Sequence, residues 1–352
     1  MTNDPTQLEV LVTGGTGFVG GHCLLQLLQA GYRVRTTVRS LARREEVLAL
    51  LREGGIDPGE RLTFVETDLG QDRNWSEAVA GCTFVLHVAS PISLAGGQNE
   101  ENTIRPAVDG TLRVLRAARD AGVKRVVVTS SFAAVGYSGK SGREPFTEED
   151  WTDPSVGGLS VYVRSKAIAE KAAWDFVRAE APGLELTTVN PTAIFGPSLG
   201  PDISSAFEIL QGLLEGRIKA CPRIDLSVVD VRDVADLHLR AMTAPAAAGQ
   251  RFLATSGEVL SLPAIAALLR ARLGDAAARV PTRALPNLLV RVLALFRPPL
   301  RPVAQQLGKR KEASNAKARQ VLGWKPRGAE EAILASARSL LNYGLIKGQP
   351  HA

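Results

Sequence analysis

A tyrosine and a lysine four residues apart, Tyr162 and Lys166, have side chains that together could transfer a proton. On a helix, side chains at this spacing lie on one face. A free phenol has a pKa near ~10, which is too high for ready proton exchange at neutral pH. A nearby ammonium group favours the phenolate, so Lys166 is expected to lower the pKa of Tyr162 toward the working range of a general acid. The pair alone is common by chance, and a solvated helix face would show the same pattern.

Two serines that follow a predicted strand are candidates for the other half of such a site. The valine-rich run Arg125–Thr129 predicts a buried strand, and Ser130 and Ser131 come directly after it. In an open α/β sheet the carboxyl ends of the strands face the ligand crevice. A hydroxyl group there can hydrogen-bond a substrate carbonyl while Tyr162 delivers a proton and a nicotinamide delivers hydride. Ordinary capping of a loop is the alternative for either serine.

Near the N-terminus, a glycine-rich turn joins a predicted strand, Glu9–Thr13, to a predicted amphipathic helix, Phe18–Ala30. Two overlapping spacings fit the turn, G-x-G-x-x-G from Gly15 and G-x-x-G-x-x-G from Gly14. Either spacing brings backbone N–H groups against a pyrophosphate, and the helix N-terminus adds a favourable dipole there. The strand before the turn and the helix after it favour a dinucleotide site over a turn without a ligand.

The residue type at the end of the second predicted strand, Arg33–Val38, distinguishes between two cofactors. An NAD site places an acid there, roughly 20 residues past the glycines, to accept a hydrogen bond from the ribose 2′-hydroxyl. This sequence has Arg39 instead, with Arg43 and Arg44 close behind. A guanidinium group suits a 2′-phosphate, and no acid is present at that place to repel it. We therefore expect NADP(H); a solvated surface charge is the alternative for Arg39.

Short branched apolar runs alternate with helical patterns through the first half of the chain. This alternation predicts an α/β fold of the Rossmann type, with a doubly wound parallel sheet. We expect an NADP-binding domain over residues 1–190, to which 226–255 returns, and a smaller, mostly helical C-terminal substrate-binding cap formed by 191–225 and 256–352. The strands expected are Glu9–Thr13, Arg33–Val38, Leu62–Thr67, Phe84–Val88, Arg125–Thr129, Leu186–Asn190 and, later, Leu226–Val231.

Composition and charge exclude several classes of protein. Apolar content of 45% and charged content of 22% are ordinary for a globular protein, and the three cysteines are too scattered for a disulfide framework or a zinc site. The longest apolar stretch, Leu285–Phe296, is too short to span a bilayer. The net charge of +6 comes from basic residues spread along the chain, without interleaved aromatics, which argues against nucleic acid. We expect a soluble, cytoplasmic protein that binds an anionic cofactor; the oligomeric state is left open.

Several other short segments of the chain form a recognisable set together with these motifs. The full set is Thr13–Gly20, Asp68-Leu69, Val88–Pro91, Thr129–Ser131, Tyr162-x-x-x-Lys166, Asn190–Pro197, Val229–Ala235 and Leu322–Pro326. Together they resemble the extended short-chain dehydrogenase/reductases, and within them the dihydroflavonol 4-reductase-like group, which also holds cinnamoyl-CoA reductases and aldehyde/ketone reductases. The resemblance implies NADPH-dependent reduction of an aldehyde or ketone to an alcohol. It covers most of the chain and is weakest from about Pro281 to Lys311.

The resemblance also implies a role for each site residue. Ser131 would polarise the carbonyl, Tyr162 would donate the proton, and Lys166 would hold the nicotinamide ribose as well as lowering the pKa of Tyr162. No metal is implied. The cofactor-binding residues it implies are Thr13, Gly14, Gly17, Phe18, Val19, Gly20, Arg39, Arg44, Asp68, Leu69, Val88, Ala89, Ser90, Thr129, Tyr162, Lys166, Pro191, Ala193, Ile194 and Ser205.

The partner expected is a small carbonyl compound of apolar or aromatic character. That expectation rests on five residues near the predicted site, namely Ser90, Ile92, Phe132, Tyr137 and Phe195.

Three other functions are compatible with the same fold. A nucleotide-sugar epimerase or dehydratase would keep NAD bound, but the acid that NAD requires is missing, and the apolar run Phe132–Ala134 follows Ser131 where dehydratases tend to carry an acid pair. A hydroxysteroid dehydrogenase is a further alternative. A non-catalytic NADP-sensing protein would commonly lack the Tyr162 and Lys166 pair, which this chain has.

Overall fold

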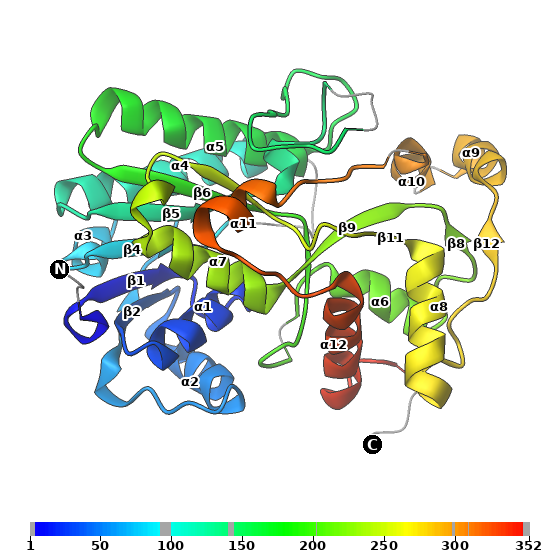
Figure 1. The fold of residues 1–352 in the computed structure, drawn as a ribbon, viewed down its shortest axis with the longest axis horizontal. Coiled ribbons are helices and arrows are strands. Elements are labelled where there is room, and N and C mark those ends of the chain that lie inside the picture. The colour runs from blue at the N-terminus through cyan, green and yellow to red at the C-terminus, as the bar shows by residue number, and fades with distance from the viewer. Residues whose placement is uncertain are drawn as a thin grey trace.

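The computed structural model describes residues 4–91, 100–139, 144–201, 203–297, 300–308 and 310–347. At its centre is a parallel sheet of seven strands: β1 (Glu9–Thr13), β2 (Arg33–Val38), β3 (Leu62–Glu66), β4 (Phe84–His87), β5 (Arg125–Thr129), β6 (Glu185–Pro191) and β10 (Arg251–Ala254). Their order is β10-β6-β5-β4-β1-β2-β3 (Figure 1). The chain winds outward in both directions from β1, and such a switch point is where open α/β sheets bind ligands. The predicted doubly wound parallel sheet is confirmed.

Successive residues of the central strand enter two different apolar cores. Val10 and Val12 point to one face of the sheet, and Leu11 points to the other. Because helices cover both faces, the strands are nearly continuous runs of branched apolar residues, which is why they were recognisable in the sequence. The first core holds α1 (Phe18–Gln29), α2 (Arg44–Glu53) and α7 (Val231–Thr243), and the second holds α3 (Trp75–Val79), α4 (Glu100–Asp120) and α5 (Val161–Glu180).

The segments after β6 build a smaller part of the molecule around a third apolar core. It contains a three-stranded sheet, a two-stranded sheet and helices that lie to one side of the main sheet in Figure 1. These elements are β7 (Ala193–Phe195), β8 (Cys221–Pro222), β9 (Asp225–Asp230), β11 (Val259–Ser261), β12 (Ala284–Leu285), α6 (Phe207–Leu214), α8 (Leu262–Leu273) and α12 (Ala329–Asn342).

The segment 226–255, expected to return to the main sheet, divides between the two parts. Its last strand, β10, joins the main sheet beside β6, with Phe252 opposite Val189. Its first strand, β9, does not return there and instead pairs with β7 and β11 in the three-stranded sheet. The expectation for Leu226–Val231 is therefore corrected. The physical reason is that β7, which directly follows β6, offers β9 a free edge.

The remaining elements complete the C-terminal half. The fully buried indole of Trp324 donates a hydrogen bond to the carbonyl oxygen of Asp233 at 3.0 Å, which ties this half to α7. Figure 1 shows α9 and α10 at the periphery of the molecule, beyond β8 and β12. The helices are α9 (Asn287–Phe296), α10 (Arg301–Gln306) and α11 (Ala316–Leu322), and the short 3-10 helices are η1 (Pro5–Gln7), η2 (Leu41–Arg43), η3 (Gly59–Arg61), η4 (Phe132–Ala134), η5 (Pro245–Ala247) and η6 (Gly274–Ala277).

Candidate active site

A cavity of about 700 Å³ lies where the carboxyl ends of strands β1 to β6 come together. Among the predicted catalytic and cofactor-binding residues, only Thr13 and Arg44 do not line it. It also contains residues that were not predicted, including Thr37, Arg43, Trp75 and Ser204. The predicted residues that line it are Gly14, Gly17, Phe18, Val19, Gly20, Arg39, Asp68, Leu69, Val88, Ala89, Ser90, Thr129, Ser131, Tyr162, Lys166, Pro191, Ala193, Ile194 and Ser205.

The turn between β1 and α1 has a backbone that only glycine adopts easily. Gly14 has a φ of 75°, in the left-handed region. A Cβ atom on Gly20 would collide with the carbonyl oxygen of Gly14. Gly17 caps α1 without a side-chain hydrogen bond, so no capping side chain covers the first-turn amides. The turn therefore presents bare backbone N–H groups at a helix N-terminus, which fits a pyrophosphate.

Thr13 supports the cavity from behind rather than lining it. Its buried hydroxyl accepts hydrogen bonds from the backbone N–H groups of Val88 and Ala89, both at 3.0 Å. It also hydrogen-bonds Nδ1 of His87 at 2.9 Å. These contacts hold the segment after β4 against the end of β1. Burial, with the charge of Lys166, lowers the pKa of His87 to about 3, so this ring stays neutral.

The arginines after β2 divide between the cavity and the protein surface. Arg39 is exposed and lines the cavity, as expected. Arg44 points elsewhere, with its guanidinium carbon 5.4 Å from the centre of the Phe64 ring. Arg43 lines the cavity in its place and forms an ion pair with Glu46 at 2.6 Å. The hydrogen bond from Arg43 lowers the pKa of the Glu46 carboxyl group.

Asp68 lines the cavity while its carboxylate shapes the turn after β3. The carboxylate accepts a hydrogen bond from the backbone N–H of Gly70 at 2.7 Å. The indole of Trp75 donates to the carbonyl oxygen of Asp68 at 3.2 Å and also lines the cavity. Trp75 therefore presents an aromatic surface beside Asp68 and Leu69, which sequence reasoning missed because it lies on a short helix with no recognisable motif.

Ser131, Tyr162 and Lys166 come together in the cavity. The hydroxyl groups of Tyr162 and Ser131 are 3.5 Å apart. The Nζ atom of Lys166 donates a hydrogen bond to the hydroxyl of Ser90 at 3.0 Å. Helix α5 carries Tyr162 in its first turn, where the hydroxyl of Ser160 accepts a hydrogen bond from the backbone N–H of Val163 at 3.3 Å and fixes the helix start.

The pKa of Tyr162 is shifted in the direction opposite to the one expected. Burial raises it, and the hydrogen bond with Ser131 opposes this only in part. The ammonium group of Lys166 is itself buried and donates its hydrogen bond to Ser90 rather than to the phenol. Burial lowers the pKa of Lys166 to about 8, against the opposing attraction of Glu170. The expected lowering of the Tyr162 pKa by Lys166 is therefore corrected.

Behind the serines lies a buried carboxylate that sequence reasoning missed. Glu170 is on α5, one turn past Lys166, and is only 2% exposed. It accepts hydrogen bonds from the hydroxyl of Ser130 at 2.5 Å and from the side-chain amide of Asn190 at 2.6 Å. The same amide lies 3.2 Å from the carbonyl oxygen of Ser131. Glu170 thus links α5 to the ends of β5 and β6 directly beneath the site.

An arginine from the edge strand balances this carboxylate. Nε of Arg251, on β10, lies 2.7 Å from Glu170, and the Arg251 side chain is 8% exposed. Its guanidinium group also donates to the carbonyl oxygens of Glu148 and Asp150 at 2.6 and 2.9 Å. The carbon of the guanidinium lies 3.6 Å from the centre of the Trp151 ring. Three segments, α5, β10 and residues 148–151, therefore meet at one buried ion pair.

Most of the predicted substrate-pocket residues lie elsewhere. Of these, Ser90 lines the cavity, whereas Ile92 is outside the described residues. Phe195 is fully buried in the third core because its strand, β7, faces that core, so this expectation is corrected. Phe132 packs edge-to-face on Phe146, and Tyr137 lies against it with ring centres 6.2 Å apart. Burial raises the pKa of Tyr137, and the charge of Tyr162 adds to this shift, so the two phenols are neighbours.

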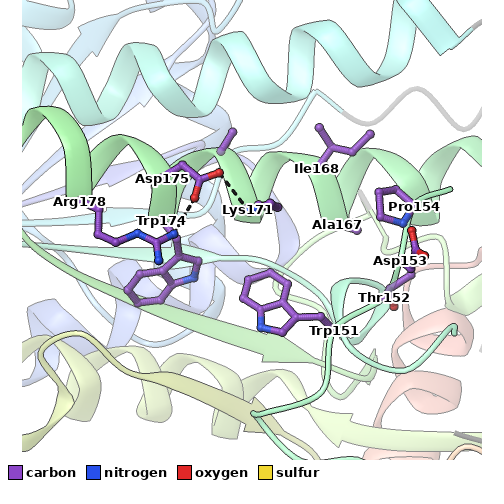
Figure 2. Close-up of a pocket in the computed structure, with 11 residues that line it drawn as sticks. Trp151, Thr152, Asp153, Pro154, Ala167, Ile168, Lys171, Trp174, Asp175 and Arg178 are labelled. Carbon is purple, nitrogen blue, oxygen red and sulfur yellow. Dashed lines mark hydrogen bonds and ion pairs between the residues drawn. The ribbon is translucent and has the colours of Figure 1, made fainter. Parts of the chain in front are cut away.

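A second cavity, of about 620 Å³, lies between α5 and residues 151–154. Figure 2 shows the rings of Trp151 and Trp174 on one side of the helix, while Lys171 and Arg178 both pair with Asp175. None of the described residues predicted for the site lines this cavity. Lys171 and Arg178 in this second cavity are already paired with Asp175, whereas the cavity at the strand ends contains Ser131, Tyr162 and Lys166. The cavity at the strand ends is therefore the candidate active site.

Comparison with known proteins gives the same fold and a set of reductases. The sequence profile described as the NAD dependent epimerase/dehydratase family matches residues 10–254. The chain is 35% identical to a dihydroflavonol 4-reductase of Zea mays over 75% of its own length and 74% of that protein. It is 36% identical to tetraketide alpha-pyrone reductase 1 of Arabidopsis thaliana, over 76% and 82% of the two chains.

A solved structure is similar over nearly the whole chain. It is the yeast methylglyoxal/isovaleraldehyde reductase Gre2 complexed with NADPH, with a TM-score of 0.79 and 26% sequence identity. The match covers 96% of this chain and 99% of the other. The small part built after β6 is therefore present in that reductase as well as the main sheet.

Proposed function

Because the chain belongs to the NAD dependent epimerase/dehydratase family, the extended short-chain dehydrogenase/reductases, we propose that it reduces the carbonyl group of a small aldehyde or ketone with NADPH. The observation that carries this proposal is the pair of hydroxyl groups of Ser131 and Tyr162, 3.5 Å apart in the cavity at the strand ends. Two hydroxyls at that distance can both hydrogen-bond one carbonyl oxygen. The named reductases among its relatives support the same class of reaction.

The cavity fits NADP(H). The bare turn at Gly14 to Gly20 would hold the pyrophosphate; glycine at position 20 lets the helix pack directly against this turn, since a Cβ there would collide with the carbonyl oxygen of Gly14. Arg39 and Arg43 would meet the 2′-phosphate with guanidinium groups. Asp68 and Trp75 would lie beside the adenine. When bound, the cofactor supplies hydride for the carbonyl carbon.

The residues of this chain would do the rest of the chemistry. Ser131 donates a hydrogen bond that polarises the carbonyl, and Tyr162 gives its phenolic proton to the oxygen as negative charge develops there. A phenol whose pKa is raised by burial keeps its proton until that moment, as a donor must. Lys166, four residues on, would hold the ribose hydroxyls with the ammonium group that contacts Ser90 in this structure.

The substrate pocket is proposed to accept an apolar or aromatic carbonyl compound. Apolar side chains of Ile194 and Ile203 line the cavity on the side of the small sheet. Such walls favour an apolar substrate body while the two hydroxyls orient its carbonyl.

The test is NADPH oxidation across a panel of carbonyl compounds. The panel includes methylglyoxal, isovaleraldehyde and a dihydroflavonol, because relatives are named for them. Tyr162→Phe should lower turnover of the best substrate by at least about a hundredfold while NADPH still binds. Tyr343→Phe, which removes a phenol hydroxyl outside the cavity, is the matched control and should keep wild-type turnover.

The result that would overturn the proposal follows from what happens to the cofactor. A reductase must release NADP⁺ after each turnover, so one NADPH should disappear for each carbonyl reduced. An epimerase or dehydratase returns the hydride to its own substrate and gains from holding the nicotinamide tightly. Protein purified without added cofactor that carries near-stoichiometric NAD⁺, and that converts a nucleotide sugar without net change in absorbance, would establish the rival function.

A further inference from the structure

Helix α9 exposes an apolar face that nothing in the described part of the chain covers. Leu288, Leu295 and Phe296 are 74%, 72% and 79% exposed, and Leu289 and Val292 are also exposed. Five of the nine large apolar side chains that are exposed among the described residues lie on this one helix. Single exposed apolar residues are ordinary, whereas a contiguous group marks an interaction site.

Helix α9 has one side packed against the protein and another side exposed to solvent. Val290 and Ala294, four residues apart, are 2% and 6% exposed and anchor the helix to the protein. The exposed residues recur at helical spacing around the other side, and Arg291 and Arg297 are exposed among them. Figure 1 places α9 and α10 at the periphery, beyond the small sheets, where a flat partner can reach them.

The segment that carries this helix has an unusual charge. Between Asp275 and Glu312 the sequence contains no aspartate or glutamate. The whole chain has a net charge of +6, so this segment alone exceeds the charge of the entire protein, and the rest is close to neutral. The positive charge that looked evenly spread is therefore concentrated in the segment of the sequence that contains α9. Its cations are Arg279, Arg283, Arg291, Arg297, Arg301, Lys309, Arg310 and Lys311.

We propose that α9 and its basic surroundings form a docking surface for an anionic phospholipid bilayer. Apolar side chains of an interfacial helix enter the boundary between headgroups and acyl chains, and flanking Lys and Arg attract anionic headgroups. Leu288, Leu295 and Phe296 supply the first contribution, and Arg291 and Arg297 supply the second. The helix lies in the plane of the interface and does not cross it.

Two other arrangements fit these observations less well. A spanning helix needs about 20 apolar residues, and α9 is ten residues long; no helix in the described ranges is both long and apolar enough to cross a bilayer. A two-fold contact between copies of the chain through this face would bring one acid-free basic segment against another. Like charges across such a contact repel, so charge favours an anionic partner over a second copy.

The test is cosedimentation of the intact chain with vesicles of phosphatidylserine and phosphatidylcholine, compared with vesicles of phosphatidylcholine alone. We expect binding to the anionic vesicles that exceeds binding to the neutral ones at least tenfold, and that falls in 0.5 M salt because electrostatic attraction is screened. Leu295→Ser with Phe296→Ser should lower binding at least tenfold. Arg291→Gln with Arg297→Gln should lower it only on anionic vesicles.

Matched control variants distinguish binding by this surface from nonspecific binding to vesicles. Val156→Ser with Val321→Ser removes two exposed apolar side chains elsewhere, and Arg33→Gln with Arg319→Gln removes two exposed charges elsewhere. Both control proteins should bind vesicles as the wild type does, and all four variants should retain NADPH binding.

Three results would overturn the proposal. One is equal binding to neutral and anionic vesicles, and another is no binding to either. The third is wild-type binding by the Leu295→Ser, Phe296→Ser variant. A dimer in light scattering that this variant converts to a monomer, without vesicle binding by the wild type, would assign the face to a second copy instead.

Discussion

Removing the buried carboxylate of Glu170 should destabilise the protein far more than removing an exposed carboxylate from the same helix. The Glu170→Ala variant leaves the guanidinium group of Arg251, 8% exposed, without its charged partner. The hydroxyl of Ser130 and the amide of Asn190 lose an acceptor at the same time. Breaking a buried ion pair by removing one partner costs about 3–5 kcal/mol, because the remaining charge is left uncompensated.

The contacts of Arg251 place the expected cost within that range. Its guanidinium group keeps two backbone carbonyl acceptors and the face of Trp151, which partly compensate the charge, and this favours the lower half of the range. We therefore expect a loss of about 3 kcal/mol in the free energy of unfolding. Total stabilities are about 5–15 kcal/mol, so the variant should still fold but with a clearly lower midpoint.

Urea unfolding followed by tryptophan fluorescence measures this cost. The indole of Trp174 lies 3.4 Å from Glu170 and serves as a local reporter. Glu180→Ala is the matched control on the same helix, since its ion pair with Arg119 is about half exposed and should contribute about 0–1 kcal/mol. Replacing both Glu170 and Arg251 with leucine should cost less than the sum of the single replacements, since neither charge is then left alone.

The reasoning fails if Glu170→Ala falls within about 1 kcal/mol of the Glu180→Ala control, the size of an ordinary surface effect. It also fails if the double replacement costs as much as the two single ones together, because the two side chains would then be acting independently.

Four other outcomes follow from the site. Arg39→Asp should weaken NADPH binding by roughly ten- to hundredfold, as expected for losing charge-assisted hydrogen bonds to a phosphate, and equal calorimetric affinities for NADPH and NADH in the wild type would contradict the assignment. Glu46→Gln removes the ion pair between Glu46 and Arg43 and should tighten NADPH binding up to about fivefold; weaker binding would show that the pair positions the arginine instead. Ser131→Ala should slow single-turnover hydride transfer and leave cofactor affinity unchanged. Burial lowers the pKa of Lys166 in the folded protein to about 8, from its usual 10.5, so the unfolded chain binds more protons between these two pH values. The stability of the cofactor-free wild type, relative to that of Lys166→Met, should therefore rise with pH across this range. Urea titrations at several pH values measure it.

The main sheet was predictable because its strands carry their own signal. Strands such as β5 are short runs of branched apolar residues covered on both faces, and β5 is followed directly by the two serines that line the cavity. Strand β9 shows the limit of that signal. The run from Leu226 is recognisably a strand, but its partner β7 is three residues long, too short for a periodic pattern, so the sheet it joins depends on contacts distant in sequence.

The two neighbouring arginines after β2 show how sensitive a site is to helix phase. Arg44 is the first residue of α2, and Arg43 is its N-cap. Consecutive residues on a helix differ by about 100° in direction, so the one that reaches the cavity cannot be chosen from sequence unless the start of the helix is known to one residue. The structure places Arg43 at the cavity and Arg44 on Phe64.

Glu170, by contrast, had a signal that went unused. Tyr162, Lys166 and Glu170 follow one another at intervals of four residues, so a helix places all three on one face. An acid on a face that must be buried against the sheet needs a cation, and Arg251 is the basic residue at the start of the apolar strand β10. The pattern therefore predicts a buried pair once the helix is assigned.

The pKa values of Tyr162 and Lys166 connect the burial of the site to the direction of its chemistry. A tyrosine that accepts a proton from an alcohol must be a phenolate near neutral pH, whereas a tyrosine that gives a proton to a nascent alkoxide must hold it until hydride arrives. Burial raises the pKa of Tyr162, so the resting site has the donor form. Lys166, with a pKa lowered to about 8, keeps most of its positive charge at neutral pH and loses it above that value. Burial therefore favours the protonated phenol at neutral pH, which is the form that can donate to a carbonyl oxygen in the proposed reduction.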